Sequence, residues 1–104
     1  MKIYHLDEME EFYGTDNWKL TIDVSDIWNQ YKNNQKNIQQ FNNEYIQRII
    51  KYKNEINDLG NDKWNAINTI LTQMNGKTDI NELIPLYDSI YDWADTNDVL
   101  IKTK

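Results

Sequence analysis

The stretch that decides the fold is IQQFNNEYIQRIIKYKNEINDL, residues 38–59 of a chain of 104. Its apolar side chains recur at spacings of three and four: Ile38, Phe41, Tyr45, Ile49, Tyr52, Ile56 and Leu59. This is the period of an α-helix that buries one face. Ile46 and Ile50 widen the apolar face on one side. We therefore expect a long central helix that contacts more than one neighbour.

Three further helices are predicted around this central helix. Ser25 is placed to cap a short helix before it, and Asn37 is placed to cap the central helix itself. Gly60 and Gly76 are placed to end the central helix and the one that follows it. Because the connection between these two helices is very short, we expect them to form an antiparallel helical hairpin.

The last helix is predicted to open at Thr78 or Asp79 and to end at Asn97. Pro85 falls inside this segment, and proline is tolerated in the first turn of a helix but not in its interior. Two interpretations are open. Either the regular helix begins near Ile84, or a short turn precedes a kink.

Short strands are predicted near both ends of the chain. Residues 18–24 alternate apolar and polar side chains, as a half-buried strand does, and Val99–Ile101 form a short apolar run. We expect these two strands to pair, and Met1–Leu6 to supply a third. The predicted fold is α+β and mostly helical, with a long central helix in a three- to four-helix bundle and a small two- or three-stranded antiparallel sheet from the termini. Residues 1–104 are predicted to form a single domain.

The composition excludes several classes of function. The chain has no cysteine, so it has no disulfide framework, thiolate nucleophile or thiolate metal site. Its formal net charge of -6 argues against nucleic acid and anionic membrane as direct partners. No apolar run resembles a signal peptide or approaches the length of a membrane span, so a cytoplasmic location is expected.

Catalysis and metal binding have little support in the sequence. His5 is the only histidine, and no glycine-rich phosphate loop is present, so an enzyme is not expected. A calcium loop that begins at Asp95 would need an acceptor at its fifth position and glycine at its sixth, where Val99 and Leu100 stand. We predict no metal and no cofactor.

Carboxylates on the last helix form the candidate binding site. Asp88, Asp92 and Asp95 stand at i, i+4 and i+7, which places them along one side of the helix, and Asp98 extends the row. Like charges at these spacings repel each other and destabilise a helix by a few tenths of a kcal/mol per pair. Two interpretations are open: a solvated helix face, or a negative row that is presented to a basic groove.

Acidic residues also gather at the other end of the chain. The net charge is -5 for residues 1–31, +2 for residues 32–63 and -3 for residues 64–104. If the terminal strands pair, these acids share one side of the molecule. Aromatic side chains beside acids are typical of protein-binding surfaces. The complete predicted surface is Asp88, Asp92, Asp95, Asp98, Asp7, Glu8, Glu10, Glu11, Tyr91 and Trp93.

Three segments carry a resemblance to known proteins: WKLTIDVSDIW (18–28), FNNEYIQRIIKYKNEI (41–56) and LYDSIYDWADTNDVLIKT (86–103). They resemble small uncharacterised phage proteins. More loosely, a small acidic protein without cysteine is similar to phage inhibitors of host defence, including anti-CRISPR and anti-restriction proteins. Some of these inhibitors imitate nucleic acid with surface carboxylates. The resemblance includes no motif that assigns a site residue.

The sequence therefore predicts a non-enzymatic, acidic protein-binding module. Its expected partner is a basic protein surface, such as the groove of a host nuclease or another nucleic-acid-handling defence enzyme. It is expected to be a monomer or a weak homodimer. The alternatives are an immunity protein or antitoxin that binds a cognate toxin, and a structural or regulatory phage protein that associates with itself through its aromatic residues.

Overall fold

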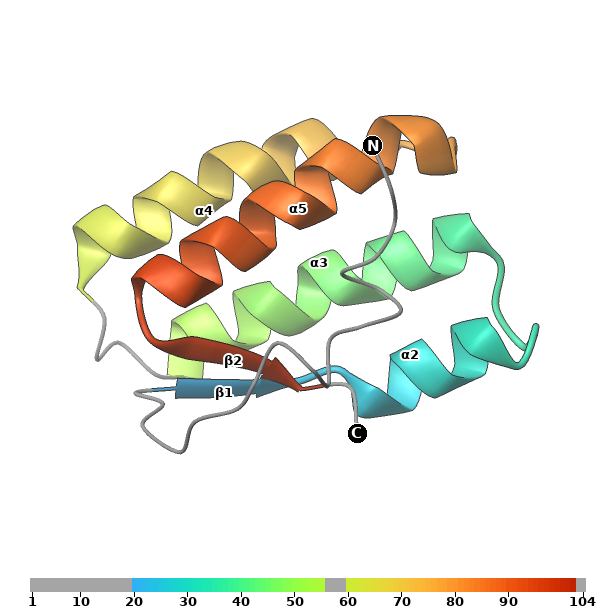
Figure 1. Ribbon diagram of the computed structural model, residues 1–104, viewed down its shortest axis with the longest axis horizontal. Helices are drawn as coiled ribbons and strands as arrows, with labels where there is room; N and C mark the ends of the chain where they lie inside the picture. The colour runs from blue at the N-terminus through green and yellow to red at the C-terminus, as the bar shows by residue number, and fades with distance from the viewer. Residues whose placement is uncertain (1–19, 56–59, 103–104) are drawn as a thin grey trace.

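The computed structural model describes residues 20–55 and 60–102, in which helices predominate over one small sheet (Figure 1). The elements follow the order β1 (Leu20–Asp23), α2 (Ser25–Lys32), α3 (Ile38–Glu55), α4 (Asn61–Met74), α5 (Ile80–Thr96) and β2 (Val99–Lys102). The prediction of a mostly helical chain with a small sheet from its two ends is confirmed. The bundle arrangement of the helices stays a prediction.

The sheet has two strands among the described residues, and they are parallel. The predicted antiparallel pairing was wrong. The reason is the number of chain reversals: β1 and α2 run one way, α3 returns, α4 runs forward and α5 returns again (Figure 1). The chain reverses once more in the turn at residues 97–98, between α5 and β2, so β2 runs in the direction of β1. Parallel neighbours need a long crossover connection, and the four helices between the strands supply it.

The register of the strands places their apolar side chains on the helical side. Leu20 pairs with Val99 and Ile22 with Ile101, and all four side chains are buried. The alternate residues, such as Thr21 and Lys102, are exposed. This period of two is what a strand requires when one face is covered and the other meets solvent. The expected third strand, Met1–Leu6, lies outside the described residues.

Helix α3 holds the centre of the core, as its periodicity predicts. Phe41, Tyr45 and Ile49 are fully buried, and Ile46 is nearly so. The helix contacts α2 on one side and α4 on the other, while α5 packs on α4 and on β2. The broad apolar face therefore serves two neighbours. The predicted continuation of α3 through Ile56 and Leu59 lies outside the described residues.

One polar side chain lies in the middle of this core. Asn42 on α3 is fully buried, and its amide nitrogen donates to the backbone carbonyl of Met74 at 2.9 Å and to that of Lys77 at 3.4 Å. Its carbonyl oxygen accepts a hydrogen bond of 3.0 Å from the hydroxyl of Tyr87 on α5. Asn42 therefore connects α3 to the end of α4 and to α5, and the amide satisfies polar groups that water cannot reach.

The helix termini show one predicted cap and one difference from the prediction. Asn37 caps α3 as predicted, because its side-chain oxygen accepts from the backbone amide of Gln40. The side-chain oxygen of Gln40 accepts in turn from the backbone amide of Asn37. Ser25, in contrast, is the first residue of α2 and not its cap. Its amide and its hydroxyl both donate to the carboxylate of Asp23, at 2.9 and 2.6 Å. Gly60, at φ 88°, is the N-cap of α4. The segment before it, where Gly60 was predicted to end the central helix, lies outside the described residues.

Pro85 lies inside α5, which is continuous and begins at Ile80. The interpretation in which the regular helix begins near Ile84 is therefore wrong. Asp79 caps α5 by accepting from the amide of Asn81 at 2.9 Å. The backbone group that loses its partner to proline is the carbonyl four residues earlier, at Asn81, and that residue is exposed. Water can solvate this carbonyl, which explains why the second turn of the helix accommodates the proline.

Candidate functional site

The predicted carboxylate row lies on the outer side of α5. Asp92, Asp95 and Asp98 are exposed, and Asp88 is half-buried. The opposite side of the helix is buried in the core through Leu83, Tyr87, Ile90, Tyr91 and Ala94. The core therefore fixes the helix on one side while the carboxylates project from the other. We call Asp88, Asp92, Asp95 and Asp98 the α5 acidic row.

The sequence around this row contains no basic residue between Lys77 and Lys102, whereas it contains six acids. Asp92 and Asp95 lie near the C-terminal end of α5, where the helix dipole disfavours negative charge by about 0.3–1 kcal/mol per group. Mutual repulsion at i, i+3 and i+4 adds a few tenths of a kcal/mol more. These carboxylates therefore oppose the stability of the helix that carries them.

The two aromatic candidates belong to the core. Tyr91 is fully buried and Trp93 is 7% exposed. The indole nitrogen of Trp93 donates to the backbone carbonyl of Lys63 at 2.8 Å, and its ring lies 5.5 Å from that of Trp64. Both side chains hold α5 against its neighbours, so the exposed part of the predicted surface is made of carboxylates. The cluster Asp7, Glu8, Glu10 and Glu11 lies outside the described residues.

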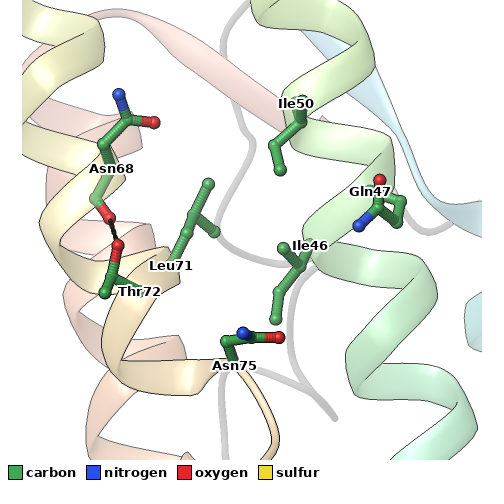
Figure 2. Close-up of a pocket in the computed structure, with 7 residues that line it drawn as sticks. All are labelled: Ile46, Gln47, Ile50, Asn68, Leu71, Thr72 and Asn75. Carbon is green, nitrogen blue, oxygen red and sulfur yellow. Dashed lines mark hydrogen bonds between the residues drawn. The ribbon is translucent and has the colours of Figure 1, made fainter.

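A second candidate surface, which the sequence did not single out, is an open groove between α3 and α4 (Figure 2). Its volume is about 400 Å³. Ile46 and Ile50 from α3 and Leu71 from α4 point toward one another across it (Figure 2). Gln47, Asn68, Thr72 and Asn75 form its polar rim. We call these seven residues the α3/α4 groove.

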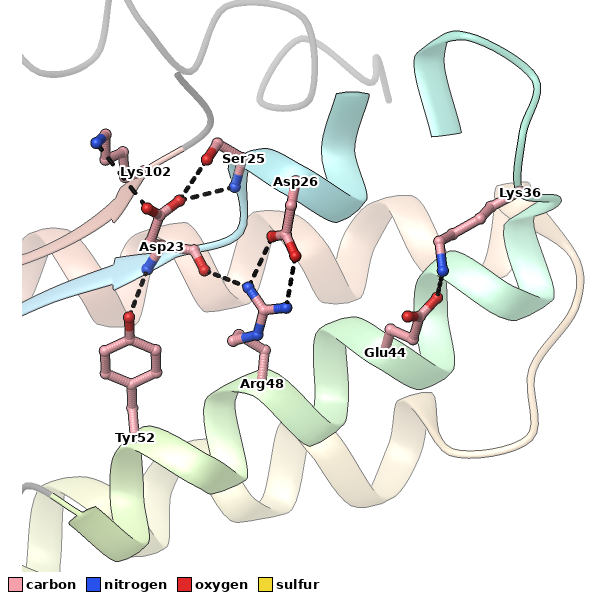
Figure 3. Close-up of polar contacts among 8 residues, drawn as sticks. All are labelled: Asp23, Ser25, Asp26, Lys36, Glu44, Arg48, Tyr52 and Lys102. Carbon is pink, nitrogen blue, oxygen red and sulfur yellow. Dashed lines mark hydrogen bonds and ion pairs between the residues drawn. The ribbon is translucent and has the colours of Figure 1, made fainter. Parts of the chain in front are cut away.

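A third cluster joins α3 to the junction between β1 and α2 (Figure 3). Arg48 donates to both carboxylate oxygens of Asp26, at 2.8 and 2.9 Å, and to the backbone carbonyl of Asp23 at 2.7 Å. The amide of Asp23 donates to the hydroxyl of Tyr52 at 3.4 Å, and its carboxylate lies 3.9 Å from the amine of Lys102. Arg48 lies outside the apolar repeat of α3, as a solvent-facing side chain would. The structure gives it a bracing contact, which no local pattern around residue 48 indicates.

The electrostatics of this cluster fit a structural role. The bidentate contact with Arg48 lowers the pKa of Asp26 to about 2, from an ordinary value of 3.8. The hydrogen bonds from Ser25 lower the pKa of Asp23 as well. Both carboxylates are ionised and held by donors at neutral pH. A group with a lowered pKa and fixed donors braces the fold and is poorly suited to accept a proton in catalysis.

The Asp26–Arg48 pair makes stability depend on pH in the acidic range. Because the pKa of Asp26 is lower in the folded chain than in the unfolded chain, its contribution is complete above pH 3.8 and is lost as the pH falls toward 2. The Asp26 side chain is 58% exposed, so solvent limits this contribution to about 1 kcal/mol or less. Urea unfolding at a series of pH values should show Asp26→Asn less stable than the parent at neutral pH, with the difference shrinking as the pH falls from about 4 to about 2.

Arg48→Lys provides the matched control for this prediction. It keeps the positive charge but lacks the planar fork that contacts both oxygens of Asp26. We expect it to recover only part of the stability that Arg48→Met loses. An equal pH dependence in the parent and in Asp26→Asn would show that the pair does not stabilise the fold.

Residues 20–55 and 60–102 contain neither a metal-binding cluster nor a membrane-spanning helix. No three acidic or histidine side chains there are grouped to hold a metal ion. None of the helices in this part of the chain is long and apolar enough to span a membrane. No family model, curated protein or solved structure matches the chain. The fold and its surfaces thus define a small acidic α+β protein, and its function is inferred from its own residues and their geometry.

Proposed function

We propose that this protein is a non-enzymatic binding module whose α5 acidic row occupies a basic groove of a partner protein. We further propose that the partner is a nucleic-acid-handling enzyme of a bacterial host and that the protein is a phage-encoded inhibitor of it. The observation that carries the proposal is that the chain has six acidic residues and no basic residue between Lys77 and Lys102. Exposed carboxylates stand on a helix with no neighbouring base in the sequence, although they oppose the stability of that helix.

The spacing of the charges supports a groove that normally holds nucleic acid. At a rise of about 1.5 Å per residue, Asp88, Asp92 and Asp95 follow one another at about 5 Å along the helix axis. One strand of duplex DNA carries a phosphate about every 3.4 Å along its axis. The row therefore reaches about two thirds of the linear charge density of a single strand. Lysine and arginine side chains that line a phosphate-binding groove can reach charges at this spacing.

The test begins with affinity purification of the partner from host lysate and continues with measured binding at two salt concentrations. Asp92→Asn/Asp95→Asn is expected to weaken binding about tenfold or more and to flatten its salt dependence, because two steering charges are lost. The same substitutions are expected to raise the free energy of unfolding by about 0.3–1 kcal/mol, since they relieve repulsion and the unfavourable dipole contact. Weaker binding by a more stable protein cannot be attributed to partial unfolding.

Asn29→Lys/Gln35→Lys is the matched control, because it changes the net charge by the same amount at exposed positions away from α5. It should bind nearly as tightly as the parent. A short DNA duplex should compete with the parent protein for the partner if the occupied groove is a nucleic-acid site. Affinity that is insensitive to salt, or unchanged in the α5 variant, would remove the groove-blocking mechanism.

Two alternative functions can be distinguished from the proposed one. The neighbouring gene distinguishes an immunity protein or antitoxin, and the oligomeric state distinguishes a self-associating phage protein. An immunity protein or antitoxin would use the same acidic surface, but a cognate toxin gene would lie beside its own. Self-association through aromatic residues has less support in the described part of the chain, because Trp28, Trp64, Tyr87, Tyr91 and Trp93 are buried there. The groove-blocking proposal is therefore the one that the exposed residues favour.

A further inference from the structure

We propose that the α3/α4 groove is a self-association surface, at which a second copy of the chain docks with twofold symmetry. This proposal concerns a surface apart from the α5 acidic row, and it stands or falls independently of the proposed function. None of the residues that line the groove comes from α5. Three features of the groove support self-association: its lack of charged residues, its hydrogen-bonding groups and its apolar floor.

The groove is free of charge in a strongly charged molecule. All seven lining residues are uncharged, and the chain has no charged residue between Lys63 and Lys77. Two charged side chains of α3 are paired on the side that faces α2: Glu44 with Lys36, and Arg48 with Asp26 (Figure 3). Lys51 and Lys53 are the other cations of α3, and neither lines the groove. With a net charge of -6, two copies repel each other wherever acidic faces meet. Because all seven residues that line the groove are uncharged, a second copy that meets these residues contacts no like charge there.

The rim of the groove is chemically self-complementary. A side-chain amide has both donors and acceptors, so it can pair with an identical amide on a second copy. Gln47, Asn68 and Asn75 each present such a group, and none of the three amides is hydrogen-bonded to another side chain or backbone group of the described residues. Asn61 and Asn65 continue the same side of α4 at helical spacing. A twofold interface requires one patch that fits itself, and this rim satisfies that requirement.

Beneath the rim, the groove has an apolar floor, and burying apolar surface away from water favours association. Ile50 on α3 is half-buried, and it faces Leu71 across the open groove (Figure 2). The floor is too open to hold a small molecule firmly, whereas helix side chains from a second copy could cover it. A surface two helices wide falls at the small end of interface sizes, below about 1,200 Å² in total, so the dimer should be weak.

A dimer of this kind would strengthen the proposed function without being required by it. Because α5 contributes nothing to the groove, both acidic rows would stay accessible after association. Two linked rows can engage a dimeric partner with an avidity above that of either row alone.

The first measurement is sedimentation equilibrium of the purified full chain from about 10 μM to about 1 mM, which covers weak association. We expect a reversible monomer–dimer equilibrium that does not weaken between about 50 and about 500 mM salt, since no charged groups meet in the interface. A monomer throughout this range would overturn the proposal. A dimer that dissociates with added salt would overturn it too, because it would join charged faces.

Asn68→Glu/Thr72→Glu tests the location of the interface. Two carboxylates on each copy should weaken dimerisation by about tenfold or more, because like charges then meet across the twofold axis. Glutamate has a higher helix propensity than asparagine or threonine, so the fold should be retained, and thermal unfolding would verify this. Asn29→Glu/Gln35→Glu changes the net charge equally outside the groove and should dimerise like the parent. Equal dimerisation in both double variants would place the interface elsewhere.

A chemical cross-link gives an independent readout, because the parent chain has no cysteine. Asn68→Cys should form an intermolecular disulfide under mild oxidation, since residues beside a twofold axis meet their own symmetry mates. Asn29→Cys, on an exposed position of α2, should cross-link much more slowly. Equal rates for the two cysteines would contradict docking at the groove.

Discussion

Replacing Ile49 by aspartate is expected to leave the chain unfolded at neutral pH. Ile49 is fully buried near the middle of α3, among side chains from several elements. The substitution removes a large apolar side chain from the core, which destabilises a protein by about 2–5 kcal/mol. It also forces a carboxyl group into an apolar site. Keeping that group protonated at neutral pH adds roughly 4 kcal/mol.

These two effects together amount to about 6–9 kcal/mol. A domain of this size has a free energy of unfolding of about 5–15 kcal/mol, so most of that stability would be lost. Circular dichroism in the far ultraviolet should show reduced helix content. The near-ultraviolet signal of the buried tryptophans should disappear at the same time, because their fixed surroundings are lost.

Asn43→Asp is the matched control, since it places the same carboxylate on an exposed position of the same helix. It should unfold cooperatively within about 0.5 kcal/mol of the parent, as surface substitutions generally do. A soluble Ile49→Asp protein with a cooperative transition would show that α3 does not hold the core in solution.

The success of the sequence in locating α3 has a physical origin. Phe41, Tyr45 and Ile49 repeat with the period of a helix, so their large apolar side chains lie on one side of α3. That side has to face the core, and all three side chains are buried there. The same reasoning located α4, α5 and both strands. Capping was predictable where a side chain acts on its own helix, as Asn37 does, because the whole interaction lies within four residues.

The direction of the sheet was not predictable from the strands themselves. Residues 20–23 and 99–102 have the pattern of half-buried strands in either orientation. Their relative direction depends on how often the chain reverses between them, which the intervening helices decide. An even number of reversals gives a parallel pair. The sequence would have had to show that α2 continues the direction of β1 and that the chain then reverses before each of α3, α4, α5 and β2.

For the candidate surfaces too, the sequence predicts features that depend on neighbouring residues of one helix. It does not predict features that depend on contacts between residues far apart in the chain. Helical spacing predicted that Asp92 and Asp95 share one side of α5, and the structure places both on the exposed side. Trp93 was a candidate for partner contact because its spacing alone did not decide its burial. Its hydrogen bond to Lys63 comes from a residue thirty positions away, which no local pattern reveals. The α3/α4 groove was missed for the same reason, since its two sides come from different helices.

Asn42 is the clearest case of a core residue that periodicity cannot identify, and its replacement by leucine has the second large expected effect. It occupies a position on the buried side of α3, but its polarity suggests a solvated residue. In the structure its amide is the hydrogen-bond partner of the Tyr87 hydroxyl and of the Met74 carbonyl. Burial raises the pKa of Tyr87, so the hydroxyl stays protonated and continues to need an acceptor.

Asn42→Leu keeps the approximate volume of the side chain but removes the acceptor of the Tyr87 hydroxyl and one of the donors to the Met74 carbonyl. Each unsatisfied group destabilises by about 1–3 kcal/mol, and the Met74 carbonyl retains a second donor in the amide of Lys77. We therefore expect a loss of about 2–4 kcal/mol in urea unfolding. The midpoint of thermal unfolding should fall by roughly 10–25 °C. Asn43→Leu, at the adjacent and exposed position, should change stability by less than about 0.5 kcal/mol.

A double-mutant cycle separates the hydrogen bond from general effects of packing. Tyr87→Phe alone leaves the carbonyl of Asn42 without its donor, and Asn42→Leu alone leaves the hydroxyl of Tyr87 without its acceptor. Removing both partners replaces the polar pair by an apolar contact, so the double variant should be more stable than the sum of the two single losses predicts. Strict additivity would mean that the two groups do not interact in solution. The connection that Asn42 makes between α3 and α5 would then contribute nothing to the fold, and its effect on stability would come from packing and from its hydrogen bonds to the carbonyls of Met74 and Lys77.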